Sequence, residues 1–355
     1  MVMGRRPDVP TASGPVTALA LAGFAGRLGM ALARVPMLKP WEGPEAAIDN
    51  IGQSVTRSVM QAFFSYTMSL PQDQLRSVEV VIDEICNVVL PPVVHRLDTD
   101  MGPGQVGGVK GIWYRPRAAS GNHPDRPRGV VLYLHGGGYI GTSPAMYSAF
   151  TGYLAHETGL GVFVPDYRLA PEFPFPAALM DAIAVFEGLT SEGIPPERII
   201  LAGDSGGGGL VTSVLQDSRS AHLPRPAAAI LFSPEVDLVL DEPSVTENAR
   251  LDILPPQVPV KPYLHGHDSH DGLVSAIYGD LDGFPPTLVA YGDEEIFRDA
   301  IRSFVGRLRA AGTETVDIEE PDMFHMYPIL MPWADASQRL YRAIAAFVDE
   351  HLPSG

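Results

Sequence analysis

Short runs of Val, Ile and Leu alternate with helical stretches from about Lys110 to the end of the chain, and this alternation constrains the fold most strongly. The apolar runs show little polar alternation, which is typical of strands buried on both faces of a mostly parallel sheet. The strand candidates are Gly129–Leu134, Gly161–Pro165, Arg198–Ala202, Ala228–Phe232, Pro286–Ala290 and Thr315–Glu319.

Helix candidates lie between these strands, at residues 176–189, 207–218, 297–311 and 334–351. Strand, helix and strand in succession predict an α/β fold, with a mostly parallel central sheet flanked by helices. The 355 residues, 45% of them hydrophobic, suffice for a sizeable core.

The first hundred residues differ from the rest, because strand signals are scarce and residues 46–69 and 72–90 have helical patterns. We expect Pro91-Pro92 to end the second helix. We therefore predict an N-terminal helical extension over residues 1–100 and a catalytic domain over 101–355. The segment 241–271 is rich in Pro, His and Asp, and it falls between two strands. We expect it to be an insertion at the functional end of the sheet.

An apolar stretch at residues 16–37 has three interpretations. Arg27 interrupts it, so no run reaches the roughly 18 uncharged residues that span a bilayer. Ala31-Leu32-Ala33 resembles a signal-peptidase site, but we favour an amphipathic helix packed on the protein. The sequence thus predicts no stable membrane insertion and a cytoplasmic location.

The charge balance excludes one class of partner. Acidic residues outnumber basic ones 42 to 25, for a net charge of −17, so nucleic acid is an unfavourable partner. The single cysteine, Cys86, rules out an intramolecular disulfide.

The segment Gly203-Asp204-Ser205-Gly206-Gly207 follows a strand candidate and opens a helix candidate. A Gly-x-Ser-x-Gly pattern in this context predicts a nucleophile elbow, in which the serine occupies a strained turn. The flanking glycines avoid the clash that a Cβ would make, and the Gly206 amide is placed to stabilise an oxyanion. A phosphate-binding loop is the competing interpretation, but the Lys-Ser/Thr pair that it needs is absent.

A second glycine cluster, His135-Gly136-Gly137-Gly138, follows another strand candidate. Consecutive glycines let backbone amides converge on one point, as in the oxyanion holes of lipases and esterases. A plain glycine-rich turn would explain this cluster alone, but the elbow about seventy residues later makes a double coincidence improbable.

His325 lies just after the last strand candidate, where a general base is expected, and the chain order serine, acid, histidine fits. The acid follows the strand candidate 286–290, where Asp293, Glu294 and Glu295 are equally placed. Its role would be to orient the imidazole. Residues 265–271 contain several His and Asp side chains that could bind a metal ion. This segment has no predicted helix or strand to hold such ligands in place, so we predict no metal site.

These motifs resemble the bacterial hormone-sensitive-lipase family of α/β-hydrolase carboxylesterases. The resemblance extends from about Gly129 to His325. The further matching segments are residues 166–172, Ser233-Pro234, Asp237-Leu238, residues 278–281, residues 283–286 and Met323-Phe324-His325.

The resemblance implies specific roles. It points to Glu295 as the acid, since this residue stands three positions before Arg298, with Asp293 as the second choice. It assigns the oxyanion hole to Gly137, Gly138 and Gly206, and it implies an N-terminal helical cap. Two departures stand out: Gly206 replaces the common Ala, and Glu235 replaces the common Trp after Ser-Pro. We expect Glu235, if it faces the pocket, to disfavour acidic acyl groups.

The predicted activity is that of a serine carboxylesterase, which hydrolyses short- to medium-chain esters through an acyl-enzyme on Ser205 without a cofactor. A lactonase or amidase with the same triad is an alternative, as is a peripheral lipase. A ligand-binding protein on an inactive hydrolase scaffold is disfavoured, because the serine, the acid and the histidine are all present. Family members often form homodimers, which makes this chain a candidate homodimer too.

Overall fold

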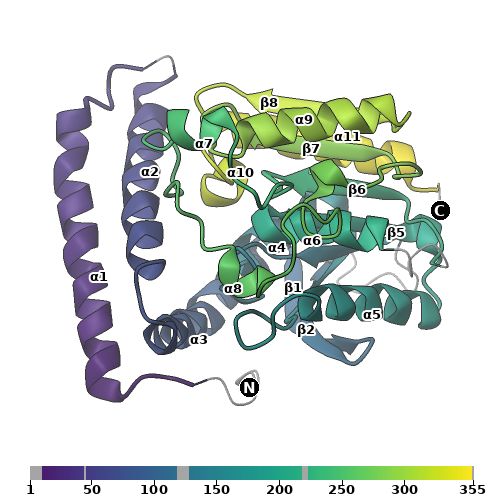
Figure 1. Cartoon of the computed structure of the whole chain (residues 1–355), viewed down its shortest axis with the longest axis horizontal. Coiled ribbons are helices and arrows are strands. Elements are labelled where there is room, and N and C mark those ends of the chain that lie inside the picture. The colour runs from purple at the N-terminus through teal and green to yellow at the C-terminus, as the bar shows by residue number, and fades with distance from the viewer. Residues whose placement is uncertain (1–9, 44, 118–127, 218–222, 354–355) are drawn as a thin grey trace.

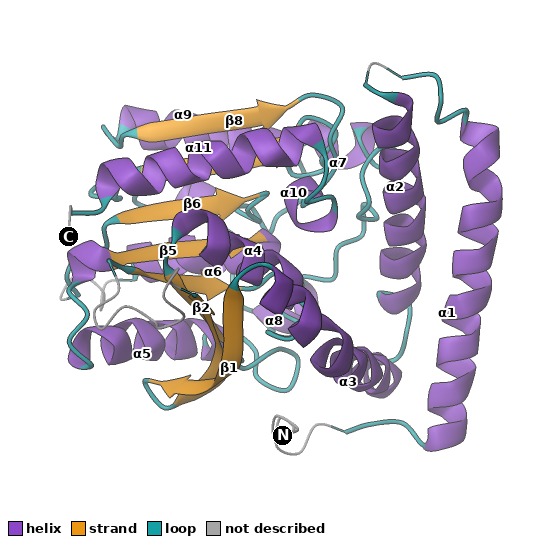
Figure 2. Cartoon of the chain, turned by 180° about the vertical axis from the view of Figure 1, so that it is seen from behind, coloured by secondary structure: helices purple, strands orange, loops and turns teal. Residues whose placement is uncertain are grey.

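The computed structural model describes residues 10–43, 45–117, 128–217 and 223–353. Within them one sheet has the strand order β1-β2-β4-β3-β5-β6-β7-β8 (Figures 1 and 2). β1 and β2 form an antiparallel hairpin, β2 pairs antiparallel with β4, and the remaining neighbours are parallel. The strands are β1 (Thr99–Val106), β2 (Val109–Pro116), β3 (Val130–Leu134), β4 (Gly161–Pro165), β5 (Ile199–Asp204), β6 (Ala228–Phe232), β7 (Thr287–Gly292) and β8 (Thr315–Glu320).

Helices cover both faces of this sheet. Helices α5, α6 and α9 lie on the face toward the viewer in Figure 1, while α4 and α11 cover the opposite face, as Figure 2 shows. The helices are α1 (Gly14–Arg34), α2 (Ala47–Thr67), α3 (Gln72–Arg96), α4 (Ser148–Thr158), α5 (Ala177–Ser191), α6 (Ser205–Gln216), α7 (Pro243–Glu247), α8 (Lys261–Leu264), α9 (Arg298–Ala310), α10 (Tyr327–Leu330) and α11 (Asp335–His351).

The predicted fold class is confirmed. Every residue of strands β3 to β7 is buried, as expected for parallel strands covered on both faces. The six predicted strands begin and end within two residues of the observed ones. The predicted helix at 207–218 begins two residues earlier, at Ser205, and residue 218 lies outside the described residues.

The sequence prediction missed the hairpin of β1 and β2, and also α4. Strand β1 carries Gly102, Pro103 and Gly104, which are breakers in a central strand but tolerated in an edge strand. Its turn uses Gly107 and Gly108, both with positive φ.

The expectation that Pro91-Pro92 ends α3 was wrong, because α3 continues to Arg96. Proline has a φ that suits a helix, and it removes only hydrogen bonds to the preceding turn. That loss is offset by packing, since Val94 is fully buried and lies against Gly152 of α4.

The apolar N-terminal stretch forms α1, which is helical as expected but packed on the protein along one face only. The Tyr66 hydroxyl donates to the Ala20 carbonyl at 2.7 Å, whereas Leu19 and Met30 are 73% and 57% exposed. By length and composition alone, the helical segment Gly14–Leu38, with mean hydropathy 1.6, is long and apolar enough to cross a membrane, although Arg27 interrupts its apolar run.

The N-terminal helices lie at one end of the sheet. Figure 2 shows the arrowheads of β6 and β8 pointing toward the side on which α2 and α1 stand. Because α/β folds bind ligands at the carboxyl ends of their strands, α2 and α3 stand beside the functional edge.

Candidate active site

Ser205 occupies a sharp turn between β5 and α6, and its φ of 51° is in the left-handed region. The glycines on either side of it are required by close packing. A Cβ on Gly203 would lie 2.6 Å from the Gly207 carbonyl oxygen, and one on Gly207 would lie 2.0 Å from the Leu134 carbonyl oxygen. Ser205 therefore stands on a strained elbow, 6% exposed, at the N-terminus of a helix.

The loop after β3 lies directly against this elbow. Gly137 and Gly138 have φ values of 116° and 57°, which favour glycine. A Cβ on Gly206 would lie 3.2 Å from the Gly138 nitrogen, so the backbones of Gly206 and Gly138 are in close contact. The structure thus brings together the three predicted oxyanion residues. The alanine common at position 206 in the family would press tightly on this loop.

Asp204, the residue before the elbow serine, holds the glycine loop in place. Its Oδ1 accepts hydrogen bonds from the Tyr133 hydroxyl at 2.7 Å and the Gly136 amide at 2.8 Å, and its Oδ2 accepts one from the Tyr147 hydroxyl at 2.8 Å. Burial raises the pKa of Asp204 to about 6, although these hydrogen bonds lower it. Asp204 thus fixes the first glycine of the loop, Gly136, through its amide.

His325 lies in the loop after β8 and is fully buried. Its Nδ1 is 3.1 Å from Oε2 of Glu295, and the other carboxylate oxygen of Glu295 accepts from the Ser233 hydroxyl at 2.6 Å and the Gly292 amide at 2.7 Å. The ring of Phe297 packs edge-on against the imidazole, with 5.2 Å between the two ring centroids. Glu295 therefore fixes the orientation of the ring, and Nε2 has no partner among the described residues.

Surrounding charges shift the pKa of His325. Burial alone lowers this pKa, but the hydrogen bond to Glu295 and the negative charges of Glu295, Asp252 and Asp204 raise it overall. The arrangement thus stabilises an imidazolium inside a buried site, as a general base in acyl transfer requires.

The other two acid candidates have different partners, and the Asp293 carboxylate accepts a hydrogen bond from the Asp322 backbone. Glu294 forms an ion pair with Arg57 of α2 at 2.6 Å, and the Asp293 amide donates to the carbonyl of Glu320. Burial raises the pKa of Asp293. Of the three carboxylates that spacing could not separate, Glu295 is the one the structure brings to His325.

The sequence interpretation missed Asp252, which lies within the segment 241–271. Its Oδ1 accepts from the His325 amide at 3.0 Å, and its Oδ2 accepts from the Ile296 amide at 2.8 Å. Asp252 therefore ties together the two loops that carry His325 and Glu295. Burial raises its pKa, while His325 lowers it. No spacing rule singles out this residue, because its partners are backbone amides far away in the sequence.

Helix α3 supports the glycine loop from the N-terminal side. Arg76 is 4% exposed, and its guanidinium binds Glu172 at 2.7 Å and Glu79 at 2.7 Å. It also donates to the carbonyls of Ala170 and Ile140. The helix is thereby joined to the loop that follows β4 and to the end of the glycine loop.

Helix α2 supports the histidine loop in a similar way. Arg57 donates to the Asp322 carbonyl at 3.1 Å, and its guanidinium lies over the Phe324 ring at 5.1 Å. Gln61 donates to the Asp252 carbonyl at 2.8 Å. Helices α2 and α3 thus both contact segments that carry site residues.

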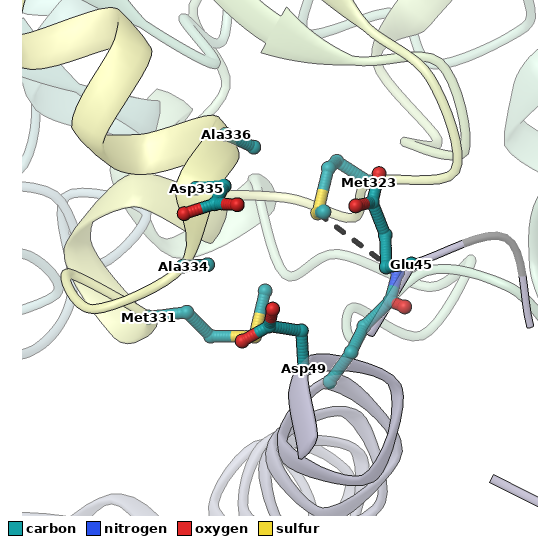
Figure 3. Close-up of a pocket in the computed structure, with 8 residues that line it drawn as sticks. Glu45, Asp49, Met323, Met331, Ala334, Asp335 and Ala336 are labelled. Carbon is teal, nitrogen blue, oxygen red and sulfur yellow. Dashed lines mark hydrogen bonds between the residues drawn. The ribbon is translucent and has the colours of Figure 1, made fainter. Parts of the chain in front are cut away.

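A pocket opens beside the histidine loop, between α2 and the start of α11 (Figure 3). Met323 and Met331 point into it from one side, and Asp49 of α2 from the other, while Gln53 contacts the Met323 sulfur at 3.9 Å. The pocket includes neither Ser205 nor His325. It is an outer hollow next to the site, because the site itself is almost fully enclosed.

The histidine cluster at residues 265–271 pairs with its own carboxylates. His267 Nε2 is 2.8 Å from Asp271, and His270 Nδ1 is 3.3 Å from Asp268. Across the described part of the chain, one group of three such side chains could share an ion: Glu314, Glu350 and His351, two of them exposed. This group stands at the opposite end of the sheet from His325, because Glu314 precedes β8.

Comparison with known proteins agrees with this geometry. Residues 131–329 match the family described as alpha/beta hydrolase fold. An acetyl-hydrolase of Streptomyces hygroscopicus is 36% identical over 247 residues, which cover 68% of this chain and 80% of that protein. An esterase of Acinetobacter venetianus is 29% identical over 273 residues, which cover 75% of this chain and 86% of that protein.

Solved structures give the same result. A hormone-sensitive lipase from a metagenome library superposes with a TM-score of 0.72 at 30% identity, covering 84% of this chain and 99% of that one. An esterase from the bacterial hormone-sensitive lipase family covers 97% of this chain and 100% of its own, with a TM-score of 0.68 at 28% identity. Family match, identity and architecture agree, and the chain therefore belongs to the bacterial hormone-sensitive-lipase family of α/β-hydrolase carboxylesterases.

Proposed function

We propose that this carboxylesterase hydrolyses short- to medium-chain esters through an acyl-enzyme on Ser205, with His325 as the general base and Glu295 as the orienting acid. One observation carries the assignment. The buried His325 contacts Glu295 through Nδ1, while its Nε2 is without a partner among the described residues. This is the state in which an imidazole can take a proton.

The reaction is an acyl transfer in two steps. His325 Nε2 takes the proton of the Ser205 hydroxyl while Oγ bonds to the ester carbonyl carbon. The carbonyl oxygen becomes an oxyanion, which the amides of Gly137, Gly138 and Gly206 stabilise, each by about 3 kcal/mol. The C–O bond to the alcohol then breaks, and the imidazolium gives its proton to the leaving oxygen. Water repeats the sequence on the acyl-enzyme and releases the acid.

The enclosure of the site supports compact substrates. Ser205 is only 6% exposed and His325 is fully buried, so a long acyl chain would have to displace parts of the cap. The relative from Streptomyces hygroscopicus is named an acetyl-hydrolase, which also points to small acyl groups.

Hydrolysis of p-nitrophenyl esters with acyl chains from acetate to laurate tests the proposal. We expect the highest kcat/KM at or below octanoate, and Ser205→Ala should lose about 10³-fold or more of the turnover. Glu295→Ala should reduce kcat strongly, whereas its matched control Asp293→Ala should stay near wild type. Full activity of Ser205→Ala would refute the nucleophile, and a collapse of Asp293→Ala alone would reassign the acid. An inert wild type would favour a ligand-binding protein.

A further inference from the structure

The loop after β6 contains a buried carboxylate that the proposed chemistry does not use. Glu235 is 1% exposed, and neither of its side-chain oxygens has a hydrogen-bond partner among the described residues. Buried carboxylates are almost always paired or hydrogen-bonded, because their desolvation costs several kcal/mol. An unpartnered one inside an enzyme therefore calls for a ligand.

Glu235 stands beside the candidate nucleophile. Its amide donates to the carbonyl oxygen of Ser205 at 2.9 Å. One turn along α6, a Cβ on Gly209 would lie 2.4 Å from the Glu235 carbonyl oxygen and 2.2 Å from the Tyr139 hydroxyl. The main-chain carbonyl of Glu235 and the Tyr139 hydroxyl therefore both pack against Gly209 of the nucleophile helix, where only a glycine leaves room for them.

Two tyrosines with unpartnered hydroxyls belong to the same cluster. Tyr139 follows the glycine loop, and Tyr263 lies on α8. Their rings stack with 3.8 Å between the ring centroids and an angle of 6° between the ring planes. Both are 1% exposed, and among the described residues neither hydroxyl has a hydrogen-bond partner. Through the Gly209 contact and the ring stack, three segments that carry buried, unpartnered polar side chains pack beside α6, and we call these side chains the Glu235 cluster (Glu235, Tyr139 and Tyr263).

Electrostatics connect this cluster with the histidine. Burial raises the pKa of Glu235 to about 7, and the charge of His325 lowers it. Burial and the charge of Glu235 raise the pKa of both tyrosines, so their hydroxyls stay protonated. The cluster therefore combines a carboxyl group, which accepts hydrogen bonds when it is ionised, with two neutral hydroxyls in the electric field of the proposed general base.

We propose that the Glu235 cluster binds a hydrogen-bond-donating group, a hydroxyl or an ammonium, on the ester held at Ser205. The inference rests on the proposed function and names its substrate class. A buried carboxylate has lost its hydrogen bonds to water. A donor group on the substrate would replace those hydrogen bonds and so contribute binding free energy. A plain alkyl ester would leave the cluster unsatisfied, and an acidic ester would meet a like charge.

Matched esters test this site directly. On the alcohol side, propyl butyrate is compared with 2-hydroxyethyl butyrate and 2-(dimethylamino)ethyl butyrate. On the acyl side, p-nitrophenyl butyrate is compared with p-nitrophenyl 3-hydroxybutyrate. The measured quantity is the ratio of kcat/KM for the donor-bearing ester to kcat/KM for its plain partner, in the wild type and in Glu235→Gln and Glu235→Leu.

We expect at least one ratio to exceed unity in the wild type and to fall by about 10-fold in Glu235→Leu, since a hydrogen bond to a charged group has about this effect. Glu235→Gln retains an acceptor oxygen, so it should keep part of the preference for the hydroxyl and lose that for the ammonium. Glu187→Gln is the control, because it removes one carboxylate that is exposed on α5 and lies outside the cluster. It should leave every ratio unchanged.

The outcomes separate this inference from the proposed function. If the wild type hydrolyses the plain esters and the ratios do not change in either Glu235 variant, the cluster holds ordered water and the inference is wrong. If the hydroxyl ratio falls but the ammonium ratio does not, the ligand is a neutral donor, and the reverse identifies a cation. If the plain esters are not hydrolysed at all, the proposed function fails, and the inference fails with it.

Discussion

At the scale of single residues, three buried carboxyl groups near His325 contact three different kinds of partner. Glu295 contacts the imidazole itself, Asp252 accepts the His325 amide, and Asp204 binds the glycine loop. Only a group that contacts the ring can set its orientation, and Glu295 also raises the pKa of His325 more than the charges of Asp252 and Asp204 do. Glu295 therefore governs protonation in our proposal, and the other two position the backbone.

A charge-removing substitution at Glu295 tests this division. In Glu295→Gln the imidazolium loses the negative charge of Glu295, and the charge-assisted hydrogen bond to the carboxylate becomes at most one to a neutral amide oxygen, so the pKa of His325 should fall. The acid limb of kcat/KM, measured from about pH 5 to 9, should therefore move to lower pH, while kcat drops about 10²- to 10⁴-fold. An acid limb that stays in place would show that Glu295 does not control the base.

Single residues also show how far the sequence could predict the site. The elbow and the glycine loop were predictable, because local backbone geometry demands glycine at fixed positions. The choice of Glu295 over Asp293 needed either the family pattern or the fold, since adjacent residues differ only in where the turn points them. Asp252 and the tyrosines of the Glu235 cluster were beyond sequence reasoning, because their contacts join segments far apart in the chain.

At the scale of elements, the interior strands were predictable and the edge was not. Strands β3 to β7 are apolar throughout because both faces are covered. In the hairpin of β1 and β2, apolar and polar residues do not alternate regularly and Pro and Gly interrupt the pattern, so the sequence of this segment is typical of a loop. Helix α3 was predicted too short, because the packing that carries it past its prolines is tertiary.

The link between α3 and the glycine loop should be energetically important. Arg76→Met leaves Glu172 and Glu79 without their buried partner, so the free energy of unfolding in urea should fall by about 3–5 kcal/mol. Glu79 also accepts the amide of Thr142 at 3.1 Å, next to the glycine loop. Without Arg76, Glu79 should hold the Thr142 amide less firmly, and the glycine loop should become more mobile. We therefore expect kcat to fall as well.

An exposed ion pair provides the control for this prediction. Arg302 and Glu319 have side chains that are 48% and 28% exposed, so Arg302→Met should cost no more than about 1 kcal/mol and leave kcat unchanged. If Arg76→Met were no more destabilising than Arg302→Met, the N-terminal helices would be a loosely attached cover and not a support for the site.

At the scale of the whole molecule, charge is distributed unevenly between surface and interior. The chain carries a net charge of −17, so the compact state repels itself increasingly as pH rises. Burial raises the pKa of Asp204 to about 6 and that of Glu235 to about 7, and it also raises that of Asp252. These buried groups make the folded state hold protons that the unfolded chain would release.

The sign of the resulting pH dependence is fixed. Asp204 and Glu235 bind more protons in the folded state between their unfolded values, about 4, and their folded values of about 6 and 7. Stability should therefore fall as pH rises through that window. The raised pKa of His325 acts in the same direction. Asp299 and Glu172 have lowered pKa values, so their contribution is lost at the acid end.

We therefore expect the Tm to be highest near about pH 5 and to fall by pH 8, as measured by thermal unfolding across a pH series. Glu235→Gln should reduce the slope, because it removes the carboxyl group whose pKa is raised to about 7. The exposed Glu187→Gln makes the same change in net charge and should leave the slope nearly unchanged. A Tm that rises steadily toward pH 8 would mean that the buried carboxyl groups ionise without penalty. The Glu235 cluster would then be open to solvent and could not select substrates by their donors.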